Sequence, residues 1–67
     1  MKVIAHEPVV TEAVPGIHRV ELDGVTVGYV LEAGSVFVSL AGSVYNTSCE
    51  IGQSLELRTA VDRVIDA

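Results

Sequence analysis

The sequence predicts an α+β domain, in which an antiparallel β-meander of three to five strands carries one C-terminal α-helix packed on one face. Two tight-turn signals divide residues 17–42, IHRVELDGVTVGYVLEAGSVFVSLAG, into three alternating strands. The C-terminal run LELRTAVDRVIDA has instead the spacing of an amphipathic helix. We expect a single domain over residues 1–67, made of an N-terminal strand or arm (1–15), the meander (16–52) and the helix (54–66).

The N-terminal segment is predicted to be an edge strand or an arm that packs on a neighbour. Pro8 and Pro15 interrupt any longer strand, because proline has no N–H to donate to a neighbouring chain segment. The tripeptide Val14-Pro15-Gly16 has the residue types of a turn, and it predicts that the first firm strand begins at Ile17.

Asp23-Gly24 is the strongest short-range hairpin signal in the chain. A two-residue turn at this position pairs Leu22 with Val25, Val20 with Val27, and His18 with Tyr29. Successive side chains of a strand point to opposite faces, so these pairs share one face of the sheet. The helix is expected to cover that face.

The second turn is predicted at Ala33-Gly34, which pairs Leu31 with Val36, Tyr29 with Val38, and Val27 with Leu40. All of these residues fall on the face already defined by the first hairpin. A slip of one residue in either hairpin would move a whole strand's apolar set to the other face. The agreement between the two turns therefore supports the predicted core face.

By the same alternation, the opposite and open face carries an apolar row of Ile17, Val30 and Phe37. Gly28 and Ser39 lie beside this row, where their small side chains would allow a close approach. These five residues are the predicted interface. We expect the chain to self-associate, as a dimer first of all, through this open face or through an edge strand.

After Gly42 the alternation stops, and residues 43–48 resemble a loop. Thr47, Cys49 and Ile51 would alternate as a short fourth strand that ends at Gly52.

The predicted helix has one continuous apolar stripe, formed by Leu57, Ala60, Val61, Val64 and Ile65. Its N-terminus is capped either by Ser54, or by Glu56 with Leu55 packing onto Ala60.

Composition also favours self-association. A chain of 67 residues buries too little surface for a strong core, and such domains usually need a disulfide, a metal or a partner. Cys49 is the only cysteine, and the spacing of His6, His18 and Cys49 fits no structural zinc motif. Yet 49% of the residues are apolar and the mean hydropathy is +0.48. Burial of apolar surface against a second copy reconciles these facts.

The net charge of −5, with only four basic residues, disfavours nucleic acid as a partner, because binding to phosphates depends on lysine and arginine. A protein partner remains compatible with this charge. The first residues contain no apolar run of signal-peptide length, and no run is long enough to cross a membrane. We expect a cytoplasmic protein without membrane contact.

No catalytic, cofactor-binding or metal site is predicted, and the protein is expected not to be an enzyme. Cys49 has no base near it in the sequence and is interpreted as a small strand residue. His18 is interpreted as a structural side chain at the open end of the sheet, and the dispersed carboxylates as solvated charges.

Two resemblances accompany these residues. The runs DGVTVGYV, VFVSLAG and IGQSLELRTAVDRVI, within residues 16–65, resemble small uncharacterised proteins of actinobacteria and their phages. That resemblance implies the same fold and no assigned activity. The order of three strands and a helix is also similar to integrase arm DNA-binding domains. Their sheet face is rich in basic and aromatic residues, whereas the predicted open face here offers Arg19 against Glu21 and Glu32.

The expected function is a non-enzymatic protein-interaction module, in a phage or host accessory role. The alternative is a small regulator that binds nucleic acid or mimics it.

Overall fold

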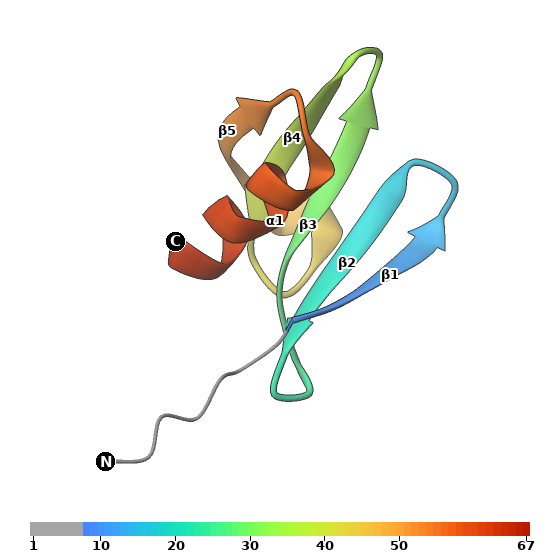
Figure 1. Cartoon of the computed structure of the whole chain (residues 1–67). Helices are drawn as coiled ribbons and strands as arrows, with labels where there is room; N and C mark the ends of the chain where they lie inside the picture. Colours follow the sequence, from blue (N-terminus) through green and yellow to red (C-terminus); the bar gives the residue numbers. More distant parts are fainter. Residues whose placement is uncertain (1–7) are drawn as a thin grey trace.

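The computed structural model describes residues 8–67, which form one antiparallel sheet of five strands and one α-helix (Figure 1). The strands lie side by side in chain order, and each pairs with the next. Their bounds are β1 Val9–Val14, β2 Ile17–Leu22, β3 Val25–Ala33, β4 Val36–Ala41 and β5 Cys49–Ser54. A 3₁₀ turn, η1 (Tyr45–Thr47), precedes β5, and α1 (Leu57–Asp66) packs across one face. The predicted α+β meander with a C-terminal helix is confirmed.

The first two turns lie where the sequence places them. Gly16 has a φ of 85°, so it provides the left-handed residue that a turn after Pro15 requires. Asp23 (φ 54°) and Gly24 (φ 79°) both have positive φ, as a type I′ hairpin turn demands, and Leu22 pairs with Val25 as predicted.

The remaining pairing of β2 with β3 differs from the prediction, because β3 contains a bulge. Glu21 pairs with Thr26, but Val20 pairs with Gly28, so Val27 is an extra residue in its strand. Beyond this point His18 lies opposite Val30 instead of Tyr29. A shift of one residue exchanges the faces of a strand. Most of β3 is therefore turned over relative to β2, and the predicted assignment of faces is wrong for this strand.

The β3–β4 turn lies at Gly34-Ser35, one residue later than predicted, and Ala33 pairs with Val36. The register moves by two residues, so that Leu31 now faces Val38. Because a shift of two preserves the alternation, β4 keeps its predicted relation to β3. The bulge therefore reverses which side chains of both β3 and β4 lie on the same face as Val20.

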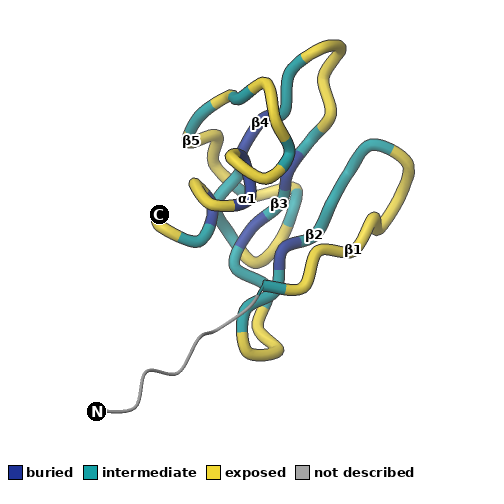
Figure 2. The backbone as a smooth tube through the Cα atoms, in the orientation of Figure 1, coloured by how far each residue is buried: buried dark blue, intermediate teal, exposed yellow. Residues whose placement is uncertain are grey.

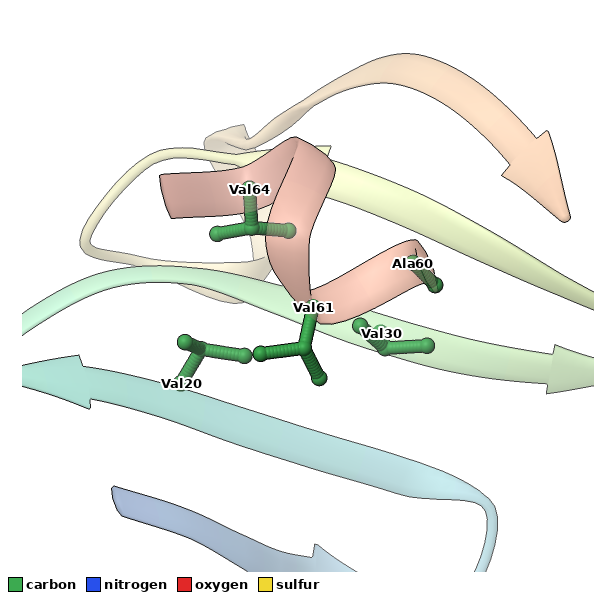
Figure 3. Close-up of a cluster of buried hydrophobic side chains, with 5 residues drawn as sticks. All are labelled: Val20, Val30, Ala60, Val61 and Val64. Atoms are coloured by element: carbon green, nitrogen blue, oxygen red, sulfur yellow. The ribbon is translucent and has the colours of Figure 1, made fainter. Parts of the chain in front are cut away.

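The core lies between α1 and the sheet face that carries Val20 and Val30 (Figure 3). Its buried members come from two strands and from the helix, and the partly buried apolar side chains surround them. The buried cluster is Val20, Val30, Ala60, Val61 and Val64, and Val27, Phe37, Leu57 and Ile65 pack against it. The predicted helical stripe is therefore confirmed as the surface that faces the sheet.

Two contacts fix the height of α1 above the sheet. Ser39 is fully buried, and its hydroxyl donates a 2.9 Å hydrogen bond to the backbone oxygen of Ala60. At Gly28, an added Cβ would lie closer than 3.0 Å to both the backbone oxygen of Leu40 and Cγ1 of Val64. Only glycine allows the helix to approach this closely.

The helix begins after Glu56, the second of the two predicted N-cap residues, but without the expected side-chain contacts. Glu56 occupies the N-cap position, but its side chain makes no capping hydrogen bond. Leu55 is 78% exposed and so does not pack onto the first turn. Ser54 instead accepts a 3.2 Å hydrogen bond from Nε of Arg63, which ties the end of β5 to the last turn of α1.

Both regions left open by the sequence include an edge strand. Among the described residues of the N-terminal segment, Val9–Val14 form the edge strand β1 between the two prolines, whereas residues 1–7 lie outside the described part. The short fourth strand predicted around Cys49 is present as β5, and it continues past Gly52 to Ser54.

Candidate functional site

The predicted interface does not form one open face. Val30 and Ser39 are fully buried beneath α1, Gly28 is buried beside Val64, and Phe37 packs against the core cluster. By its pairing with Leu31, Ile17 belongs to the opposite face. The bulge at Val27 causes this difference, because it moves the even-numbered residues of β3 to the side of Val20. Three of the five predicted residues are therefore buried, and the other two, Ile17 and Phe37, lie on opposite faces, so the predicted interface is not formed.

The face opposite α1 instead carries a set of side chains from the three central strands, all half-buried except the buried Val38. By register these are Ile17, Arg19, Tyr29, Leu31, Val38 and Leu40. Val38 is already only 8% exposed. The Tyr29 hydroxyl donates a 3.0 Å hydrogen bond to the Ser43 backbone oxygen, and its ring meets Tyr45 edge-on at 5.6 Å. Nε of Arg19 is buried without a hydrogen-bond partner among residues 8–67.

The most exposed element of the sheet is β1. All six of its residues are exposed, including Val9 at 58%, Val14 at 52% and Val10 at 38% (Figure 2). Among the strands of residues 8–67 it pairs with β2 alone, so no described strand pairs with the backbone groups along its other side. The valines here are exposed because α1 packs on β3, β4 and β5, with few contacts to β2.

An open groove lies between β1 and the first turns of α1. It has a volume of about 480 Å³, and its lining is Pro8, Val10, Leu57, Arg58, Val61 and Asp62. Its floor is apolar, and the two charges on its helical side have opposite signs. The helix packs mainly on β3, β4 and β5, so the groove remains open on the β1 side of the sheet.

A second cluster joins three neighbouring strands on the face shared with the core. Glu12 of β1, His18 of β2 and Glu32 of β3 place one potential ligand atom each within 4.8 Å of one another. Nε2 of His18 lies 2.8 Å from a carboxylate oxygen of Glu32, and the Gly16 amide donates a 3.0 Å hydrogen bond to Glu12. The sequence alone identifies His18 as structural and the carboxylates as dispersed charges, so the cluster itself is not predicted.

Two bulges bring this cluster together. A regular turn at Pro15-Gly16 would put Glu12 opposite Arg19, but the irregularity between Glu12 and Val14 puts it opposite His18. The bulge at Val27 likewise moves Glu32 to the face of His18. Sequence alternation gives no signal for either irregularity, which is why it misses both carboxylates.

Cys49 is exposed on β5, at the sheet edge opposite β1. The cluster of His18 lies on β1–β3, so the described residues place no histidine beside this thiol. No helix within residues 8–67 is both long enough and apolar enough to span a membrane.

No family model, curated protein or solved structure matches the chain.

Proposed function

We propose that the protein is a cytoplasmic, non-enzymatic protein-interaction module that forms a homodimer by pairing of its β1 edge strands. The observation that carries this proposal is the exposure of β1, which has six exposed residues, three of them valine. An exposed edge strand with apolar side chains pairs readily with another strand unless charge or proline prevents it. Within Val9–Val14 there is no proline and no lysine, and Glu12 is the single charge.

A second copy is the partner that fits this edge. Two identical strands pair antiparallel about a two-fold axis, so that a residue of one copy faces a different residue of the partner and the same contact is repeated on the other side of the axis. The pairing would extend the sheet of five strands into one of twice that number. The edges on both sides would lose their unpaired backbone groups.

The groove beside β1 supports the same partner. In a single chain the groove is lined by apolar side chains of Val10, Leu57 and Val61. In the dimer, the partner's edge strand would cover these side chains and bury apolar surface. Arg58 and Asp62 lie on the same rim with opposite charges, so a two-fold arrangement can place each opposite the other. Self-pairing is therefore compatible with the overall acidity of the chain.

The small core gives an energetic reason for association. The buried apolar residues among those described are all small, five valines and one alanine: Val20, Val30, Val38, Val61, Val64 and Ala60. Each fully buried valine contributes roughly 1.5–3 kcal/mol, and a domain of this size has little to spare against conformational entropy. Apolar area buried at a dimer interface adds to that margin.

The test compares two valines of equal exposure. Val9 on β1 is 58% exposed and Val25, at the β2–β3 turn, is 61% exposed. We expect light scattering coupled to size exclusion to give twice the 7.1 kDa chain mass for the wild type and for Val25→Lys. Val9→Lys should give the single-chain mass, because a lysine on an edge strand opposes pairing.

A wild type that stays at 7.1 kDa up to chain concentrations of about 1 mM, where even a dimer with a Kd of about 1 mM would be populated, would disprove the dimer. Leu31→Asp separates the two surfaces of the sheet, since Leu31 lies on the face opposite α1. If Leu31→Asp dissociates the dimer and Val9→Lys does not, association uses that face and the edge assignment is wrong.

A further inference from the structure

We propose that Glu12, His18 and Glu32 form a binding site for a divalent transition-metal ion, with zinc(II) as the best match. One imidazole and two carboxylates are a ligand set that zinc accepts, with water completing the coordination. The imidazole nitrogen distinguishes this set from the all-oxygen sites of magnesium and calcium. This inference is independent of the proposed dimer, because all three ligands come from one chain.

The distances suit such an ion. The three ligand atoms lie within 4.8 Å of one another. Around a zinc ion with bonds of about 2.0–2.2 Å, tetrahedral ligand atoms are about 3.4 Å apart. The widest separation must therefore close by about 1.4 Å, which rotation of a glutamate side chain provides. Glu32 is 43% exposed and free to make this movement, whereas His18 is held at 12% exposure.

The turn at Gly16 holds both carboxylate-bearing strands in place. Its amide donates to Glu12 Oε2 at 3.0 Å, and its carbonyl oxygen accepts a 2.8 Å hydrogen bond from the backbone N–H of Glu32. Groups that orient metal ligands in this way commonly contribute to affinity. One residue thus positions the ligands on either side of His18.

The charge balance favours a cation. Two carboxylates lie near a single imidazole, which contacts Glu32, and among residues 8–67 neither carboxylate has a lysine or arginine partner. Zinc would take the place of the contact between His18 Nε2 and Glu32 and would balance the charges of both carboxylates. The ion would then cross-link β1, β2 and β3 at the end of the sheet that α1 does not cover.

The bulges provide separate support. Regular pairing would leave Glu12 and Glu32 on the face opposite His18, and two independent irregularities in β1 and β3 turn them both toward it. Bulges often serve to re-aim a side chain beside a functional site. A simple ion pair between His18 and Glu32 would need only one of them.

The experiment is calorimetric titration of the full chain with zinc chloride, in a Cys49→Ser, His6→Gln background that removes the other soft ligands of the sequence. We expect one saturable site with a Kd of about 1–50 µM. His18→Gln and Glu12→Gln should each weaken binding by at least about tenfold, since even the outer-shell partners of metal ligands contribute about 10–100-fold. Glu50→Gln, an exposed carboxylate on β5, is the matched control and should bind zinc like the background.

Two further measurements distinguish loss of the zinc site from loss of the fold. Thermal unfolding in EDTA shows whether each variant is folded, and added zinc should then raise the melting temperature of the background more than that of Glu12→Gln. The ring ¹⁵N resonances of His18 should shift on zinc addition. The proposal is wrong if folded background protein binds zinc more weakly than about 100 µM, or if His18→Gln and Glu12→Gln bind it unchanged.

Discussion

At the scale of single residues, the contact between helix and sheet depends on two small side chains that the sequence assigns to an open surface. Gly28 leaves room for Val64, and Ser39 donates a buried hydrogen bond to Ala60. Both are small for the reason predicted, which is close approach of a neighbour. The neighbour is the helix of the same chain.

Gly28→Ala should lower the free energy of unfolding by about 1–3 kcal/mol or more, because the new methyl group overlaps the Leu40 backbone oxygen as well as Val64. Urea unfolding followed by circular dichroism measures this change. Gly52→Ala is the matched control. It is also a strand glycine, but its Cβ would meet the flexible side chain of Arg63 at 3.2 Å, which can move aside. Equal losses in the two variants would contradict the tight helix contact at Gly28.

At the scale of elements, α1 stabilises the sheet through its stripe and contributes little through its N-terminus. Its N-cap residue makes no side-chain hydrogen bond, so burial of the stripe must hold the helix in place. In the sheet, the turns determine which strands pair. The irregularities at Val27 and near Glu12 determine which side chains of β3 and β1 point toward the helix.

Val64→Ala should destabilise the protein by about 1.5–3 kcal/mol, since Val64 is 2% exposed and the change removes buried methyl groups and leaves a cavity. Thr59→Ala, an exposed position of the same helix, should change stability by less than about 0.5 kcal/mol. Both are measured by urea unfolding at one protein concentration. A loss at Thr59 as large as that at Val64 would show that the stripe does not hold the helix.

At the scale of the whole molecule, α1 covers the middle of the sheet and leaves β1 with exposed valines and an adjoining groove. The chain is elongated, with extents of 43 × 23 × 19 Å, and the β1–β2 hairpin stands away from the helix (Figure 1). This shape leaves an edge for a partner and the Glu12, His18 and Glu32 cluster open to solvent.

If β1 pairs with a second copy, stability must depend on concentration, because association removes folded chains from the unfolding equilibrium. With an unfolding enthalpy near 0.7 kcal/mol per residue, a tenfold rise in concentration should raise the melting temperature by about 5 °C. Scanning calorimetry of the wild type and of Val25→Lys should show this rise. Val9→Lys should melt at a temperature independent of concentration, and a wild type that does the same would argue against the dimer.

The sequence by itself determined the elements: the two-residue turn at Asp23-Gly24, the strand order and the buried stripe of the helix all follow from local residue types and spacing. The tertiary structure decided which sheet face the helix covers. That choice depends on one extra residue, Val27, whose effect on register is not encoded in alternation. It moved Val30, Gly28 and Ser39 into the interior and placed Phe37, half-buried, against the core. The same displacement, with the irregularity in β1, gathered Glu12 and Glu32 around His18, because side-chain proximity across strands depends on register and register is set by the whole sheet.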